Sequence, residues 1–163
     1  MANEEVHDYF TQLLSDVDVL IYGRETYQLM VPFWPDVAKN KTGSKAMNDF
    51  AQAFNSVGKI VVFSKTLEEA EEKTIIVRTN LKEEILKLKQ EPGKNILVGG
   101  VDIPTQLIQL GLIDEFRFVI HPIVAGEGRR LLKGVNLQKK LQLKLVESKV
   151  FQSGGIALTY SKS

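Results

Sequence analysis

Apolar residues recur along this chain at two spacings, which predict alternating helices and strands. Residues 4–15 and 45–54 carry apolar side chains three and four positions apart, as an amphipathic helix does. Short runs with a continuous apolar core have the length of buried strands. These runs are residues 17–22, 59–64, 74–77 and 96–98. Because helices separate them, they indicate a mostly parallel sheet with helices on both faces.

Shorter patterns predict the remaining elements before residue 110. Residues 25–30 read as one or two helical turns, and residues 33–35 are expected to open a loop after Pro32. Asn80 caps a predicted helix that ends at Pro92, and a further short helix follows Gly100.

The last third of the chain has a different pattern, in which apolar and polar residues alternate. The alternating apolar residues are Phe116, Phe118 and Ile120, then Leu141, Leu143 and Leu145, then Ile156, Leu158 and Tyr160. A turn over residues 153–155 joins the last two sets, so we predict an antiparallel hairpin at the C-terminal end. Residues 129–133 are expected to form the last helix.

Composition narrows the class of protein. The 163 residues contain no repeat or linker, which predicts a single domain over residues 1–163. The absence of cysteine excludes disulfides and thiol nucleophiles and fits a reducing compartment. With only His7 and His121, a histidine metal cluster is excluded, and we expect no metal. The net charge of +1 argues against a nucleic-acid partner, and no apolar run approaches the ~18 residues of a membrane span, so a cytoplasmic protein is expected.

Glycine, hydroxyl or cationic groups follow three of the predicted strands. Gly99 and Gly100 lie between a strand and a helix, where Asp102 is expected to act as N-cap and Pro104 to occupy the first turn. The second junction holds Gly23, Arg24 and Thr26, and the third holds Ser64, Lys65 and Thr66. Each alone also fits a plain turn or a helix cap. Since ligands gather at the carboxyl ends of parallel strands, their coincidence predicts one extended ligand with several phosphates.

Other residues leave two interpretations open. Trp34 can stack on a flat ligand or pack against the domain. His121 is expected to be structural, and Arg129, Arg130 and Lys133 to form a solvated helix face. Asp114 and Glu115 are adjacent on a strand and point to opposite faces, so they form no acid–base pair.

Five segments together resemble the dihydrofolate reductase-like superfamily, and most closely its branch of RibD C-terminal reductase domains from riboflavin biosynthesis. Residues 23–27 (GRETY) are similar to that family's G-R-x-T-Y junction, and residues 63–67 (FSKTL) to its V-S-R-T-L strand end. Residues 98–100 match the start of its G-G-G turn. Residues 111–116 (GLIDEF) and 121–128 (HPIVAGEG) are similar to its G-L-[IV]-D-E-[LF] and P-[IV]-x-x-G-x-G signatures. The similarity covers nearly the whole chain from about Glu4.

The resemblance implies a three-layer α/β/α fold and a reductase related to 5-amino-6-(5-phosphoribosylamino)uracil reductase, with NADPH as hydride donor. It implies a small heterocyclic substrate of the pterin or pyrimidine type beside Tyr27, Trp34, Val124 and Gly126. The cofactor-binding residues it implies are Gly23, Arg24, Thr26, Ser64, Lys65, Gly99, Gly100, Val101, Asp102 and Ile103.

The chain departs from the family pattern in two places. Val101 stands where the family has a third glycine. The chain also starts directly in the first helix, so the family's central first strand has no counterpart, and no proton donor is identified. The alternative to a reductase is therefore a nucleotide-binding or structural homodimeric domain without catalysis. In either case the apolar C-terminal strands predict a homodimer.

Overall fold

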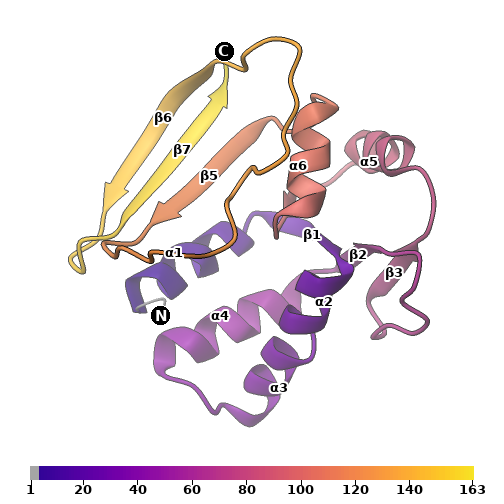
Figure 1. Ribbon diagram of the computed structural model, residues 1–163. Helices are drawn as coiled ribbons and strands as arrows, with labels where there is room; N and C mark the ends of the chain where they lie inside the picture. Colours follow the sequence, from indigo (N-terminus) through magenta and orange to yellow (C-terminus); the bar gives the residue numbers. More distant parts are fainter. Residues whose placement is uncertain (1–3) are drawn as a thin grey trace. The chain divides into compact units, whose positions relative to one another are not determined.

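The computed structural model describes residues 4–163 and is shown in Figure 1. The chain forms two compact units, one ending at Ile103 and the other comprising residues 104–163. Helix α6 (Asp102–Gln109) begins in the first unit and continues into the second. Within the described residues, no helix combines the length and the apolar character needed to cross a membrane.

The first unit contains a four-stranded sheet in which every neighbouring pair is parallel. The strands, in the spatial order β3-β2-β1-β4, are β3 (Thr74–Val77), β2 (Lys59–Phe63), β1 (Val17–Gly23) and β4 (Asn95–Val98). All four predicted apolar runs are therefore strands, and their parallel arrangement is confirmed.

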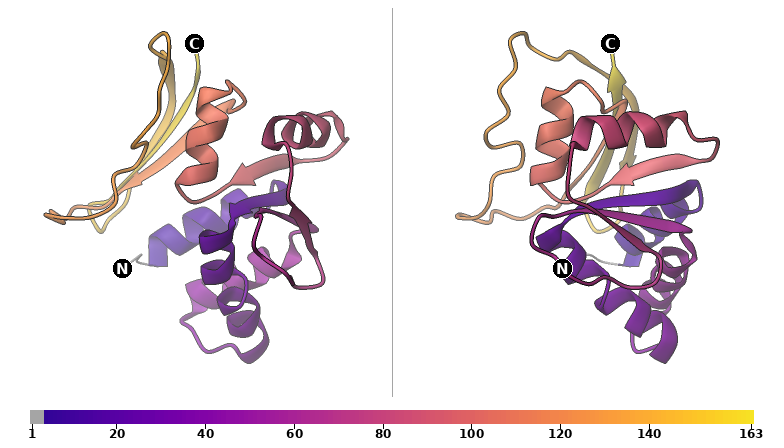
Figure 2. Two further views of the ribbon diagram at one scale, coloured as in Figure 1. Left: turned by 45° about the vertical axis from the view of Figure 1, so that its right-hand side comes forward. Right: turned by 90° about the vertical axis from the view of Figure 1, so that its right-hand side faces the viewer.

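Helices cover both faces of this sheet. They are α1 (Glu4–Leu14), α2 (Arg24–Met30), α3 (Phe33–Asn40), α4 (Lys45–Ser56) and α5 (Leu81–Gln90). Helix α5 lies on the opposite side of the sheet from α2 and α4 (Figure 2). Two-sided cover explains why each strand has consecutive apolar residues, since consecutive side chains point to opposite faces.

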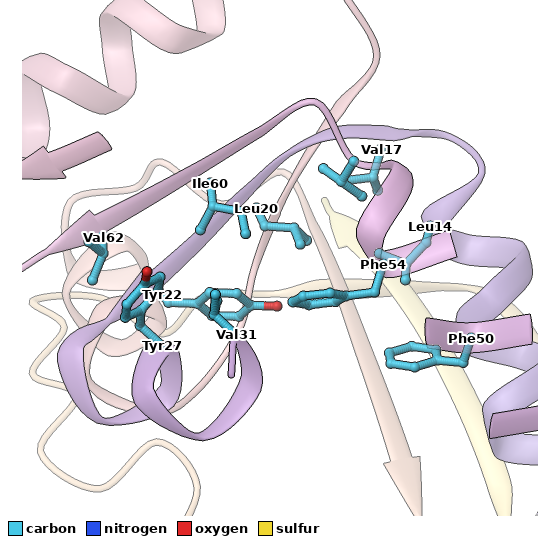
Figure 3. Close-up of a cluster of buried hydrophobic side chains, with 11 residues drawn as sticks. Leu14, Val17, Leu20, Tyr22, Tyr27, Val31, Phe50, Phe54, Ile60 and Val62 are labelled. Carbon is cyan, nitrogen blue, oxygen red and sulfur yellow. The ribbon is translucent and has the colours of Figure 1, made fainter. Parts of the chain in front are cut away.

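A cluster of buried apolar side chains lies on the face of the sheet that α1, α2 and α4 cover (Figure 3). Leu20 and Tyr22 of β1 and Val62 of β2 are nearly inaccessible there. The helices contribute residues such as Phe54, which is 2% exposed. Burying side chains of this size stabilises the fold by about 1.5–3 kcal/mol each.

Helix α3 replaces the loop expected at residues 33–35. Pro35 occupies the first helical turn, where its missing N–H would have no partner in the helix anyway. Val37 and Ala38 are buried against Ala51 of α4. Tertiary packing of this short apolar face therefore outweighs the loop signal of two nearby prolines.

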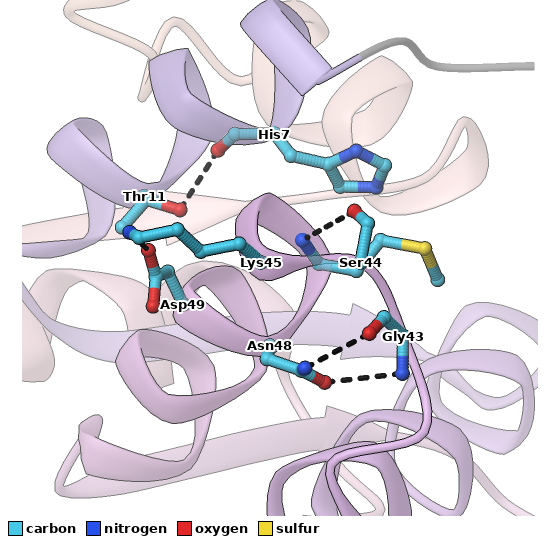
Figure 4. Close-up of polar contacts among 8 residues, drawn as sticks. His7, Thr11, Gly43, Ser44, Lys45, Asn48 and Asp49 are labelled. Carbon is cyan, nitrogen blue, oxygen red and sulfur yellow. Dashed lines mark hydrogen bonds and ion pairs between the residues drawn. The ribbon is translucent and has the colours of Figure 1, made fainter.

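Side-chain contacts order the start of α4 (Figure 4). The Ser44 hydroxyl accepts a hydrogen bond from the backbone N–H of the third helical residue. The Asn48 amide donates to the Gly43 carbonyl and accepts from the Gly43 N–H. Lys45 forms an ion pair with Asp49 one turn later, and the hydrogen bond to Asp49 is the main cause that raises the pKa of Lys45. Its exposed position makes this pair a minor contribution to stability.

The second unit contains a three-stranded antiparallel sheet of its own. Its strands, in the spatial order β5-β7-β6, are β5 (Glu115–Ile120), β7 (Ile156–Lys162) and β6 (Leu143–Val150). The β6–β7 pair confirms the predicted hairpin, although Leu141 lies before the strand. Among the described residues, no strand pairs with the outer edge of β4 or of β5.

The prediction of a helix at residues 129–133 is wrong. Residues 131–134 form a turn within an irregular segment between β5 and β6, and Leu132 has a φ of 61°. Gly128 and Gly134 border the five residues, and both have positive φ values. A helix of this length, bordered by glycines and without a buried face, cannot offset the cost of nucleation.

One face of the antiparallel sheet is apolar on all three strands. Two cross-strand rows run over it, Phe116–Tyr160–Leu145 and Ile120–Ile156–Val150. Leu145, Ile120 and Val150 are 51%, 54% and 71% exposed.

Candidate functional site

The parallel sheet brings the three predicted junctions to a single edge. Gly23 is the last residue of β1 and pairs with Phe63, the last residue of β2. Ser64 follows Phe63 directly, and Gly99 follows β4 on the other side of β1. The glycine, hydroxyl and cationic groups singled out by the sequence therefore line the carboxyl edge of three adjacent strands.

The glycine pair after β4 packs closely against β1 and α2. A Cβ atom on Gly99 would lie 2.8 Å from Cε1 of Tyr22, and one on Gly100 would lie 2.5 Å from Oγ1 of Thr26. Gly100 also has a φ of 92°, which side chains other than glycine rarely adopt. The side chains of Tyr22 and Thr26 therefore occupy the space beside the two glycines. The Gly99 N–H donates to the carbonyl of Ile21 at 3.1 Å, so a ligand at this turn would meet the N–H of Gly100.

Helix α6 starts directly after this turn. Asp102 is its first residue rather than the expected N-cap, and Val101 precedes it. Ile103 is buried and lies 3.4 Å from the position of a Cβ atom on Gly23. Of the residues predicted here, Ile103 can therefore offer a ligand only its backbone.

The turn after β2 presents a hydroxyl and a cation. Ser64 Oγ accepts hydrogen bonds from the backbone N–H groups of Thr66 (3.2 Å) and Leu67 (2.9 Å), which leaves its own O–H available to donate. Lys65 is exposed, and its ammonium makes no ion pair or hydrogen bond with any described residue; the same holds for the guanidinium of Arg24. Two unpaired cations thus lie at the carboxyl edge.

The structure adds Arg78, which the sequence reasoning missed. Arg78 follows β3, the fourth parallel strand, at the same edge. Its guanidinium donates to the carbonyl oxygens of Lys65 (3.3 Å) and Leu67 (2.6 Å). Its position after a parallel strand was the signal that could have found it.

The predicted substrate residues fall in both units. Tyr27 is 5% exposed, and its hydroxyl accepts a hydrogen bond from the backbone N–H of Glu71 at 2.9 Å. Trp34 is half-buried, with its ring 4.5 Å from that of Phe50 in an edge-on contact. Both side chains thus have structural partners in the first unit. For Trp34, this contact is the packing against the domain that was one of its two predicted roles.

Val124 and Gly126 lie in the irregular segment of the second unit. Val124 is fully exposed, and Gly126 has a φ of 74°. A shared substrate site formed by these two residues with Tyr27 and Trp34 stays a prediction.

The remaining titratable groups offer little chemistry. Burial raises the pKa of Tyr22 well above its ordinary value, so its hydroxyl stays protonated. Glu115 forms an ion pair with Arg117 at 2.6 Å, and Asp114, which precedes β5 rather than lying on it, forms one with Lys162 at 3.9 Å. Over residues 4–163, no group of acidic or histidine side chains is arranged to hold a metal ion.

A cavity of about 290 Å³ lies in the second unit. Its lining includes Ile108, Phe116, Leu141 and Lys162, and none of the predicted site residues.

A parallel sheet with helices on both faces, followed by an antiparallel sheet, is the architecture of a dihydrofolate reductase-like α/β protein. The solved structure of dihydrofolate reductase from Enterococcus faecalis in complex with NADP(H) superposes with a TM-score of 0.62 at 14% identity, covering 100% of this chain and 84% of that one. That level of identity shows the shared fold.

The chain belongs to the RibD C-terminal domain family, whose family model matches residues 1–157. The uncharacterized protein YyaP of Bacillus subtilis strain 168 is 36% identical over 152 residues, which cover 93% of this chain and 77% of YyaP. A crystal structure described as a riboflavin biosynthesis protein from Shewanella sp. PV-4 has a TM-score of 0.71 and 25% identity, covering 94% of this chain and 78% of that one.

Proposed function

We propose that the protein is an NADPH-dependent reductase that transfers a hydride to a small heterocyclic substrate of the pterin or pyrimidine type. The observation that carries this proposal is the carboxyl edge of the parallel sheet. There the tightly packed turn of Gly99 and Gly100 lies on one side of β1, and the exposed Lys65 lies on the other. Membership of the RibD C-terminal domain family and the fold shared with an NADP(H)-binding dihydrofolate reductase support it.

The residues at this edge fit the parts of a dinucleotide phosphate. The backbone N–H of Gly100 can donate to the pyrophosphate, whereas that of Gly99 already donates to the carbonyl of Ile21 at 3.1 Å. Arg24 and the Thr26 hydroxyl supply charge and a donor beside them. Ser64 and Lys65 provide an O–H donor and an unpaired cation for the 2′-phosphate.

NADPH, when bound, supplies the hydride. The chain's own residues bind the cofactor and hold it in one orientation. We propose that Tyr27 and Trp34 of the first unit contact the heterocyclic substrate, as the family resemblance implies.

Two measurements test the proposal. Isothermal titration with NADPH and NADH tests binding, and no heat with either at millimolar cofactor would overturn the proposal. Loss of absorbance near 340 nm is then followed with quinones, pterins and ribosylaminopyrimidines. Turnover on at least one of them is expected. Binding without turnover on the whole panel would favour a nucleotide-binding domain that lacks catalysis.

A further inference from the structure

Hydrogen bonds within the turn after β2, and others from Arg78 beyond it, hold this turn in place. Inside, Ser64 Oγ accepts from the N–H groups of Thr66 and Leu67. Outside, Nη1 of Arg78 donates to the Lys65 carbonyl and Nη2 donates to the Leu67 carbonyl. The Ser64 N–H also donates to the carbonyl of Val77, so the turn is tied to the end of β3 by backbone as well.

The guanidinium is suited to this contact. Its planar fork presents several N–H groups at fixed positions, so it can bridge two carbonyl oxygens two residues apart, whereas a lysine offers one ammonium on a flexible stem. The Arg78 bonds engage only the backbone of Lys65. The Lys65 side chain is left exposed and free to bind a ligand.

This turn also carries an excess of positive charge. Within the described residues, neither Lys65 nor Arg78 forms an ion pair with an acidic side chain, although Glu68 and Glu69 follow closely in the chain. An anion bound at the turn would offset this charge, and a phosphate would offset it more than a neutral hydroxyl would.

We propose that Arg78 is a positioning residue for the cofactor 2′-phosphate, acting by bridging the Lys65 and Leu67 carbonyls so that Ser64 and Lys65 face the phosphate. The proposal rests on the proposed function. It assigns Arg78 no contact with the reacting atoms, and it predicts that Arg78 sets the preference for NADPH over NADH.

The test compares Arg78→Gln, Arg78→Lys and the control Lys73→Met in the full chain. Lys73 is matched to Arg78 because its ammonium also donates to a backbone carbonyl, that of Asn55, from the far end of the same connection between β2 and β3. Affinities for NADPH and NADH are measured by calorimetry. Hydrogen exchange at the amides of Thr66 and Leu67 is measured without cofactor.

Both Arg78 variants are expected to weaken NADPH binding by about tenfold or more, the effect of a lost charge-assisted bond, and to leave NADH binding within about twofold. Hydrogen exchange at the amides of Thr66 and Leu67 should accelerate in both Arg78 variants. Lys73→Met should change neither the cofactor affinities nor the exchange rates. The lysine variant separates geometry from charge, since it keeps the cation but lacks the planar fork whose two nitrogens reach the two carbonyls separately.

Wild-type affinity in Arg78→Lys would overturn the positioning role. Equal weakening of both cofactors, or unchanged exchange at Thr66 and Leu67, would overturn it as well. Failure of the proposed function looks different, because the wild-type chain would then bind neither cofactor.

Discussion

The Thr26 hydroxyl oxygen occupies the space beside Gly100, 2.5 Å from where a Cβ atom would lie. Gly100→Ala is therefore expected to reduce the free energy of unfolding by about 2–4 kcal/mol, through overpacking and through a positive φ that alanine adopts poorly. Urea unfolding measures the change.

Gly111→Ala is the matched control, because Gly111 also has a positive φ of 71° but no atom within 4 Å of the added Cβ. It should cost only about 1–2 kcal/mol. Adding Thr26→Ala to Gly100→Ala should recover part of the loss. Equal costs for the two glycine variants would show that the contact with Thr26 is unimportant.

Lys65 is expected to determine cofactor preference. Lys65→Ala should weaken NADPH binding by about 1–3 kcal/mol, the range for a charge-assisted hydrogen bond, and leave NADH binding nearly unchanged. Lys65→Arg keeps the charge and should retain most of the affinity. Calorimetric titration with both cofactors checks this, and equal weakening of both would mean that Lys65 acts elsewhere.

Because Tyr22 is buried, we expect the free energy of unfolding to fall at alkaline pH. Burial raises its pKa in the folded protein above the ordinary value of about 10 that the unfolded chain keeps. Below pH 10 the Tyr22 hydroxyl is protonated in both the folded and the unfolded state. As the pH rises above 10 it ionises in the unfolded chain first, so the free energy of unfolding falls by about 1.4 kcal/mol per pH unit. Unfolding should be measured from pH 9 to 11.5 for the wild type and Tyr22→Phe. Tyr22→Phe should lose less stability over this range, and parallel curves for the two proteins would contradict the prediction.

The apolar face of the antiparallel sheet leads us to propose a homodimer. Ile120 and Val150 lie at opposite ends of one cross-strand row and are more than half exposed. Covering such a patch with a second copy removes it from water, and self-association is most often two-fold.

Light scattering at micromolar concentration should give about twice the mass of one chain. Val150→Glu should shift the protein toward monomer. Lys149→Glu, on the neighbouring strand residue that points to the opposite face, should not. A monomeric wild type would refute the proposal.

The sequence predicted most of the strands because each depends on a local pattern. Strand β3 has the bounds predicted for it, Thr74–Val77, since three consecutive apolar residues there stand between polar ones. Helix α3 was missed because its stability comes from packing Val37 and Ala38 on α4, which outweighs the local signal of Pro35.

The sequence predicted the part of the candidate site that lies at strand ends, but not its long-range contacts. A general rule about strand ends places Gly23, Ser64 and Gly99 at one edge. The bonds of Arg78 to carbonyls 11 and 13 residues earlier, and of Tyr27 to Glu71, depend on how the chain folds back. No local spacing encodes them.

The central claim is that NADPH binds at the carboxyl edge of the parallel sheet. The most direct measurement is a titration of the isotope-labelled protein with NADPH, followed through its backbone amide NMR signals. The signals of Gly23, Ser64, Lys65, Gly99 and Gly100 should shift, and NADH should move those of Ser64 and Lys65 less. No shift at millimolar NADPH, or shifts confined to other residues, would contradict the claim.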